Sequence, residues 1–262
     1  MADTIITALR DNPLSDVVNI TDASYPADPA GTSANHSYFE NNVHNYLAIL
    51  GKHALPSRTF EVSQAYAGLG DPFFETVYAA YQQATGTSSS NKLLIKIKSK
   101  GSSYTEALAL NQSGHITFKG ETEYTSVLSG AITITAGVHI FINVGFNNNI
   151  TVSGGTAIFI NCTQLNGVFT QSGGSTVILS DCRSWGFIGV SGNSNTLFIE
   201  NMKAIKVGTG GNILNSINLD SGMTGGVYVL SNVRLEGLLS NAGGLTVEES
   251  QLKENATSRP AY

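Results

Sequence analysis

The fold is decided by one stretch of the sequence, GGTAIFINCTQLNGVFTQSGGSTVILSDC, which spans residues 154–182. Within it, an apolar run followed by a polar residue and a cysteine occurs twice, at Ile158–Cys162 and at Ile178–Cys182. A Ser-Gly-Gly turn precedes each run. β-Branched and aromatic residues favour strands, and Gly favours the turns between them. The stretch therefore predicts two short strands that repeat about twenty residues apart.

The same pattern recurs on both sides of this stretch. Aligned on its polar residue, it occurs at Asn143, Asn161, Asp181, Asn201, Asn232 and Gln251. Successive members are 18, 20, 20, 31 and 19 residues apart, and a Gly/Ser/Asn-rich insertion at 216–226 accounts for the long interval. Strands and Gly-rich turns at this period, without a helical pattern, predict a mainly β fold. We expect a right-handed parallel β-helix, a solenoid with coils of about 18–20 residues.

Equivalent positions in such a solenoid stack about 4.8 Å apart. The residue after each polar position should be buried, which gives a stacked core of Val144, Cys162, Cys182, Met202, Val233 and Leu252. The polar positions, from Asn143 to Gln251, should form a ladder whose amides hydrogen-bond along the axis. The residues that follow the core column should face outward: Gly145, Thr163, Arg183, Lys203, Arg234 and Lys253. The charged members suit a solvated face or a contact with an acidic partner.

Three consecutive predicted strands are apolar on both faces, as in Ile158–Ile160. One face fills the interior of the coil, and strands with this pattern are buried on both faces. The chain offers no second layer after residue 90, so we expect a neighbouring subunit to cover the other face. We assign the subunit interface to Phe159, Leu179 and Ile199.

The chain upstream of the repeat has a different character. Five of the six prolines lie within the first 72 residues, whereas residues 124–180 contain no charged side chain. Helical spacing of apolar residues predicts helices at about 37–51 and 71–84, and alternation predicts a strand at Leu93–Ile97. We divide the chain into an extended arm (1–36), a small helical region with a linker (37–90), a β domain (91–255) and a tail (256–262).

Composition excludes several classes of protein. The 262 residues carry 14 Lys+Arg against 19 Asp+Glu, a net charge of −5 that disfavours nucleic-acid binding. A hydrophobic fraction of 41% excludes a disordered chain. No apolar run has the length of a membrane span or the form of a signal peptide, so we expect no membrane insertion. Two cysteines are too few for a disulfide scaffold.

The order of these parts resembles the virion surface proteins of tailed bacteriophages, which include tailspikes, short tail fibres, head fibres and capsid decoration proteins. The resemblance is architectural, covers about residues 90–255, and rests on no diagnostic motif. It implies a homotrimer of β-helices that projects from the particle and binds capsid or tail proteins through residues 1–85. It also implies synthesis in the host cytoplasm, a location on the virion, and, for spike-type members, contact with host-surface glycans.

Carboxylates are the first candidates for catalysis, because glycosidases need two of them about 5–9.5 Å apart. The acids of the repeat region are Asp181, Glu200, Asp220, Glu236, Glu248 and Glu249. Asp181 and Glu200 fall on adjacent coils, and Asp220 lies in the insertion. Arg183 follows Asp181 by two residues, so a surface ion pair is the competing interpretation. We assign no catalytic residue.

The cysteines and histidines give little support for other chemistry. Cys162 and Cys182 lie one coil apart, which is compatible with a disulfide, but their apolar column favours buried thiols. The five histidines have no metal-binding spacing, so we predict neither a metal nor a cofactor.

We therefore predict a non-enzymatic structural protein of a phage-like virion. The small number of coils suits capsid decoration better than a long host-reaching spike. A short tail fibre or tailspike for host attachment is the first alternative. A β-helical polysaccharide lyase or hydrolase is the second.

Overall fold

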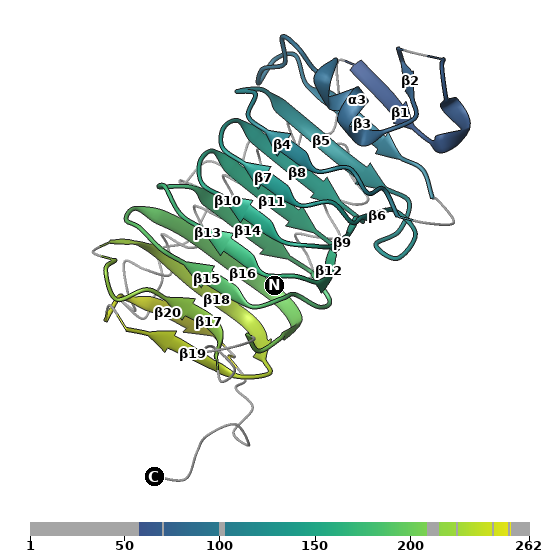
Figure 1. Cartoon of the computed structure of the whole chain (residues 1–262). Helices are drawn as coiled ribbons and strands as arrows, with labels where there is room; N and C mark the ends of the chain where they lie inside the picture. Colours follow the sequence, from purple (N-terminus) through teal and green to yellow (C-terminus); the bar gives the residue numbers. More distant parts are fainter. Residues whose placement is uncertain are drawn as a thin grey trace, which may run out of the picture. The chain divides into compact units, whose positions relative to one another are not determined.

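The computed structural model describes residues 58–69, 71–99, 103–208, 215–223, 225–242, 244–250 and 252, all within one compact unit, Ser57–Tyr262. They form a mainly β protein, a parallel β-solenoid of about seven turns over residues 93–249 (Figure 1). The predicted parallel β-helix is confirmed. The expected arm (1–36), the expected helix at 37–51 and the tail (256–262) lie outside the described residues.

The largest sheet, sheet A, contains ten described strands, all paired in parallel, in the order β2-β1-β3-β5-β8-β11-β14-β16-β18-β20. These strands are β1 (Arg58–Val62), β2 (Phe73–Phe74), β3 (Leu93–Ile97), β5 (His115–Gly120), β8 (Val138–Ile142), β11 (Thr156–Ile160), β14 (Thr176–Ser180), β16 (Asn195–Ile205), β18 (Gly226–Leu235) and β20 (Val247–Ser250). The strand predicted at Leu93–Ile97 is confirmed as β3.

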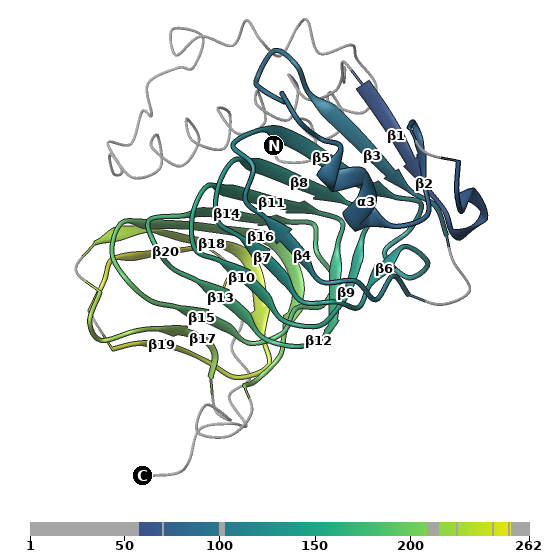
Figure 2. The same ribbon diagram turned by 45° about the horizontal axis from the view of Figure 1, so that its top comes forward.

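Two smaller parallel sheets form the other sides of the coil. Sheet B contains β6 (Val127–Leu128), β9 (Gly145–Asn147) and β12 (Thr163–Asn166). Sheet C contains β4 (Leu108–Leu110), β7 (Ile132–Ile134), β10 (Ile150–Val152), β13 (Phe169–Gln171), β15 (Ile188–Val190), β17 (Asn215–Leu219) and β19 (Leu238–Asn241). A central coil passes through sheets A, B and C in turn, and Figure 2 shows the three sheets around one interior.

Each central coil turns sharply at one corner residue, which follows β8, β11 and β14 and lies within the longer strands β16 and β18. The corner residue has a left-handed backbone conformation in five successive coils, with φ of 56°, 48°, 55°, 51° and 52° at Asn143, Asn161, Asp181, Asn201 and Asn232. Asn and Asp adopt this conformation more readily than other residues with a side chain. At the opposite end of sheet A, Gly173 has a φ of +67°, and a Cβ there would lie 2.2 Å from the carbonyl oxygen of Ser153. The repeated Asn/Asp and Gly residues are therefore requirements of the coil.

The N-terminal end of the solenoid is closed by a short helix, α3 (Val77–Gln82), rather than by the longer helix predicted at 71–84. That prediction was wrong at its start, because Phe73 and Phe74 pair with β1 as strand β2. A short 3-10 helix, η3 (Gln64–Tyr66), lies between the two strands. Residues 58–90 are therefore part of the solenoid's sheet and cap, and not a separate helical region.

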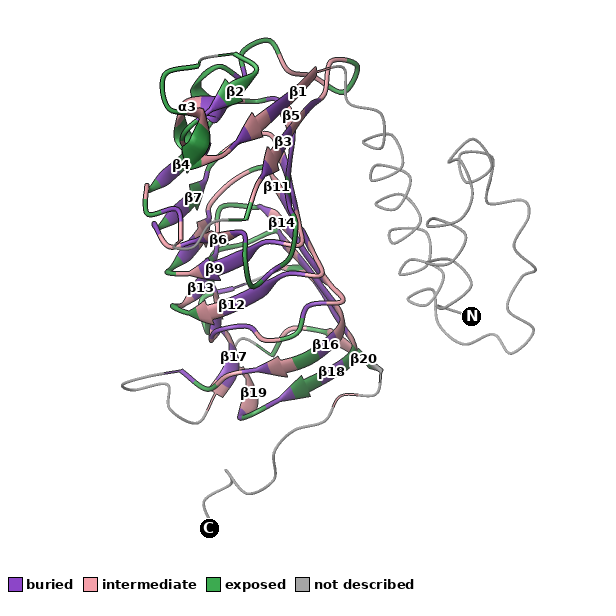
Figure 3. Cartoon of the chain, turned by 90° about the vertical axis from the view of Figure 1, so that its right-hand side faces the viewer, coloured by how far each residue is buried: buried purple, intermediate pink, exposed green. Residues whose placement is uncertain are grey.

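The interior is organised around stacked aromatic rings. Phe118 lies 4.8 Å from Phe141 and Phe141 lies 5.1 Å from Phe159, with ring planes within 9° of parallel in both pairs. These spacings match the separation of neighbouring strands, so the stack follows the solenoid axis. Trp185 packs against the edge of Phe159 at 5.2 Å and is fully buried. Interior burial is visible along the strands in Figure 3.

The interface assignment of Phe159, Leu179 and Ile199 was wrong. All three belong to the interior cluster and are at most 1% exposed. They lie opposite one another in neighbouring strands and continue the inward-facing column that contains Phe141. Both faces of these strands are apolar in sequence, so alternation alone does not distinguish the inner face from the outer.

The aromatic stack gives the first testable expectation. Replacing Phe159 with Ala removes a ring that contacts neighbours along the axis and across the coil. We expect the free energy of unfolding to fall by about 3–5 kcal/mol, measured by chemical denaturation at a fixed m-value. Phe187→Ala is the control, because that half-buried ring lies against Gly189 at the surface. Equal losses in both variants would contradict the stack's role.

Candidate functional site

The outer face of sheet A carries a continuous apolar column. Register places its five members opposite one another in successive strands: Ile140, Ile158, Ile178, Phe198 and Val229. Their exposed fractions are 0%, 0%, 8%, 3% and 5%, yet none of them belongs to the interior cluster. No further described element lies outside this part of the sheet (Figure 3). The column is a packed surface, and not a solvated one.

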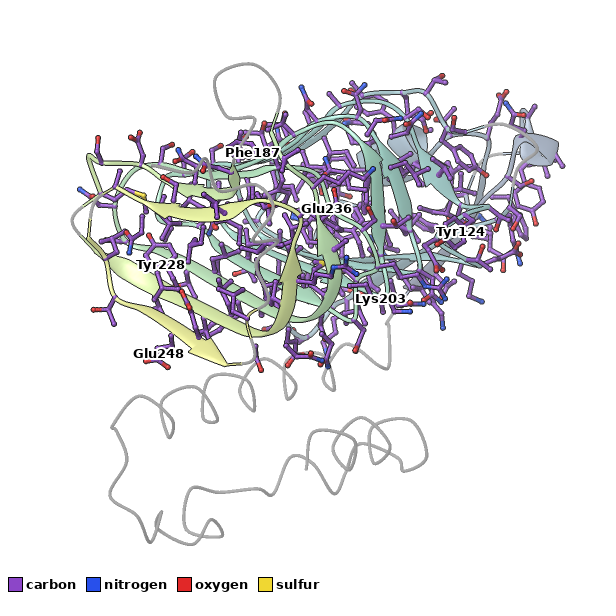
Figure 4. The ribbon with its side chains drawn as sticks, turned by 90° about the horizontal axis from the view of Figure 1, so that it is seen from below. Tyr124, Phe187, Lys203, Tyr228, Glu236 and Glu248 are labelled. Atoms are coloured by element: carbon purple, nitrogen blue, oxygen red, sulfur yellow. The ribbon has the colours of Figure 1, made fainter. Side chains whose placement is uncertain are left out.

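Two further columns flank this apolar column on the outer face. On one side the residues are β-branched: Val138, Thr156, Thr176, Thr196 and Val227. On the other side, next to the corner, the column changes from apolar to polar along the axis: Ile142, Ile160, Ser180, Glu200 and Ser231. The face is therefore most apolar over β8 and β11. Glu248, labelled in Figure 4, ends the central column after Val229.

This column was missed in the sequence because the wrong one of two apolar sets was chosen. The inward-facing and outward-facing sets differ in the number of sequence positions by which they precede the corner residue. Phe159 precedes Asn161 by two positions and faces inward, whereas Ile158 precedes it by three and faces outward. The residue after the corner, Cys162, faces inward again because the left-handed corner interrupts the alternation.

The stacked core column is buried as the repeat implies. Val144, Cys162, Cys182, Met202 and Val233 are at most 2% exposed. Leu252 is partly buried against the same cluster. Both cysteines are free thiols, and burial raises the pKa of Cys162 to about 12. Such thiols act as small apolar side chains and not as nucleophiles.

The polar ladder runs along the corner in two separate pieces. Asn161 Nδ2 donates to Asn143 Oδ1 at 2.8 Å. Further along, Asn201 Nδ2 donates to Asp181 Oδ1 at 3.2 Å, and Asn232 Nδ2 donates to Asn201 Oδ1 at 2.9 Å. Each of these bonds thus runs from a side-chain amide to the side-chain oxygen of the corner residue in the preceding coil. Gln251, the last expected member, lies outside the described residues.

The ladder is interrupted at Asp181. An ionised carboxylate accepts hydrogen bonds but has no hydrogen to donate. Asp181 can therefore accept from Asn201 but cannot donate to Asn161 Oδ1. Within the described structure the side chains of Asn161 and Asp181 share no hydrogen bond. The interruption is a direct consequence of Asp at a position where the other described rungs have Asn.

A carboxylate pair lies beside this interruption. Ser180 Oγ donates to Glu200 Oε1 at 2.6 Å and lies 3.3 Å from Asp181 Oδ2. Burial raises the pKa of Glu200, and the charge of Asp181 raises it further, while the bond from Ser180 opposes the shift. The predicted neighbours Asp181 and Glu200 are thus brought together around one hydroxyl group. Asp220, Glu236 and Glu249 are exposed elsewhere on the described surface.

The expected outward column of cationic residues is only partly outward. Arg183, Lys203 and Arg234 are exposed, but Gly145 and Thr163 are buried. That part of the expectation was wrong, because the loop at 121–126 covers the corner. A Cβ on Gly145 would lie 2.2 Å from the Glu123 carbonyl oxygen. Tyr124 of this loop and Lys203 are labelled in Figure 4, and Lys253 lies outside the described residues.

The sequence suggested an ion pair between Arg183 and Asp181, but Arg183 pairs with Glu123 instead. Its Nε lies 3.0 Å from Glu123 Oε1, and its guanidinium lies 5.6 Å from the centre of the Tyr124 ring. Glu123 is only 4% exposed, so the pair ties the loop to a coil formed sixty residues later. No local sequence signal identifies a partner at that separation.

The described residues contain no group of three His, Cys, Asp or Glu side chains arranged to hold a metal. Among them, no helix has the length and apolar character of a membrane span. Comparison of the chain with known protein families, with curated proteins and with solved structures found no match. The chemistry of the described surface is therefore the basis for assigning a function.

The interrupted ladder gives a second expectation. Asp181→Asn supplies the missing donor to Asn161 and keeps a corner residue that tolerates positive φ. We expect an increase of about 0.5–1.5 kcal/mol in the free energy of unfolding, measured by chemical denaturation. Asn201→Asp is the matched control, because it removes the donor to Asp181 and should lower stability. A loss of stability in Asp181→Asn would refute the explanation.

The raised pKa of Glu200 gives a third expectation. The folded state keeps this proton at pH values at which the unfolded chain has lost it, so the wild type loses stability as the pH rises above 4.5. Glu200→Gln removes this dependence, and its advantage over the wild type should grow from acid to neutral pH. Unfolding at a series of pH values measures it. The exposed Glu249→Gln control should show no such growth, and a Glu200→Gln advantage independent of pH would contradict the expectation.

Proposed function

We propose that this chain is a non-enzymatic structural protein of a phage-like virion, where it forms a homotrimer and is attached through its N-terminal region. The observation that supports this most is the apolar column on the outer face of sheet A. The five side chains of this column line up strictly from coil to coil. They are at most 8% exposed within the single chain, so a partner copy can bury them only in place of the atoms that cover them there.

A second copy of the chain is the occupant that suits this face. The column is straight, repeats at the strand spacing and is flanked by β-branched side chains on one side. Three identical columns can therefore pack around a three-fold axis, with each coil meeting the same coil of its partners. Residues 1–85, which include β1, β2 and α3 at the end of the solenoid, are the region that we propose binds capsid or tail proteins.

Capsid decoration fits the dimensions better than host attachment. About seven turns at about 4.8 Å give a rod of roughly 35 Å, which is short for a spike that must reach a receptor. Gold-labelled antibody against this chain should mark the head of the particle. Labelling of the tail instead would favour the short tail fibre or tailspike, for which a host-surface glycan is the expected ligand.

A polysaccharide lyase or hydrolase is the second candidate, and the carboxylate pair is the observation that favours it. Glu200 has a raised pKa beside Asp181, as a general acid requires. Both groups, however, are engaged by Ser180 and Asn201. Polysaccharide cleavage by the wild type that is lost in Glu200→Gln would replace the structural assignment with this one.

The trimer interface gives a fourth expectation. Ile178→Asp places a charge in the middle of the outer column without touching the interior. We expect light scattering to show a trimeric mass for the wild type and a monomeric mass for the variant, because a buried, unpaired carboxylate is costly. The circular dichroism of the β-solenoid should be retained. Ile158→Ser is the milder second variant if Ile178→Asp does not fold.

Thr170→Asp is the control, because it adds the same charge to the exposed outer side of sheet C. It should remain trimeric. A monomeric wild type would reject the trimer. A trimeric Ile178→Asp variant would place the interface on another face.

A further inference from the structure

One buried polar side chain in the interior has no role in the repeat. His139 on β8 faces inward in a column whose neighbouring members are Ile116 and Ala157. It is 0% exposed, and neither ring nitrogen has a hydrogen-bond partner among the protein atoms. Its nearest aromatic neighbours are Tyr81 of α3, at 6.1 Å between ring centres, and Phe118 of β5, at 6.3 Å. A neutral imidazole fits this place as an apolar ring.

Protonation of His139 would put a positive charge in these surroundings with no acceptor. Burial accordingly lowers its pKa, and with a smaller contribution from the charge of nearby His115 the pKa falls from 6.5 to about 4. The titratable groups facing it are few. Tyr81 of α3 is the one on the inner side, His115 acts from the outer face of β5, and Ala157 and its neighbours on β11 contribute none. The described surroundings supply no carboxylate to neutralise the imidazolium.

Of the elements around His139, α3 is held to the rest of the structure by the fewest hydrogen bonds. β5, β8 and β11 are held by continuous parallel pairing on both sides. The six-residue helix is held by packing of Val77, Ala80 and Tyr81 and by a few hydrogen bonds. Glu106 Oε1 accepts from the Val77 amide at 2.7 Å, and the Tyr81 hydroxyl accepts from the Gln112 amide at 2.8 Å. Short elements with few contacts open first.

We propose that α3 is an acid-sensitive cap: protonation of His139 releases Tyr81 and the helix from the N-terminal end of the solenoid. Opening gives the imidazolium access to water while the coils below keep their strand pairing. The cap opens in a monomer and in a trimer alike, so it is independent of the proposed assembly.

The size of the effect follows from proton linkage. In the open state His139 titrates with its ordinary pKa of 6.5, against about 4 in the closed state. The ratio of open to closed molecules then rises roughly twentyfold between neutral pH and about pH 5. The effect is lost when the imidazole is replaced by an apolar side chain of similar size.

Hydrogen exchange of the full-length protein, corrected for the intrinsic effect of pH, tests the cap. Amides at 77–84 should exchange roughly twentyfold faster, relative to those at 156–180, at about pH 5 than at neutral pH. His139→Phe should abolish this difference, and His139→Met serves if Phe is too large. His115→Gln, on the outer face, should behave as the wild type.

Three outcomes would overturn the cap. The first is no relative acceleration at 77–84 in the wild type. The second is acceleration that persists in both His139 variants, which would identify Glu106 or His115 as the titrating group. The third is equal acceleration over the whole solenoid, which would mean global unfolding and no separate cap.

Discussion

Register between neighbouring coils controls where every side chain of the solenoid lies. Parallel pairing fixes which residue of one coil lies over which residue of the coil before. A slip of one residue would turn every side chain to the opposite face. The left-handed corner at Asn161 and its equivalents repeats at the same point of each central coil. Because register is kept, the rings of Phe118, Phe141 and Phe159 stack along the axis.

The same register that fills the interior also builds the outer face. Residues such as Ile158 and Ile178 align as strictly as the interior residues between them. A regular apolar face on a rigid support is what symmetric association requires, because identical coils can meet at identical heights. The proposed structural role follows from this regularity. Capsid decoration and host attachment then differ in whether the solenoid binds the capsid or the host surface.

The residues that depart from the repeat are the ones whose contribution to stability should change with pH. Most polar groups at the corner satisfy one another along the ladder, which makes them insensitive to pH. Asp181, Glu200 and His139 break the rule in different ways: a missing donor, a half-buried acid and a buried base without partners. Sites that violate local consistency are the expected places for function or strain.

The order of residues is enough to predict the solenoid, its period, the corner positions and the buried column of Cys162 and Cys182. It is enough because each depends on a spacing that recurs in the chain. The folded coil was needed to show which apolar set faces inward, since both sets alternate equally well in sequence. It alone also paired Arg183 with Glu123 and placed Tyr81 beside His139, because these contacts join segments with no shared period. Long-range packing, unlike register, leaves no repeating trace in the order of residues.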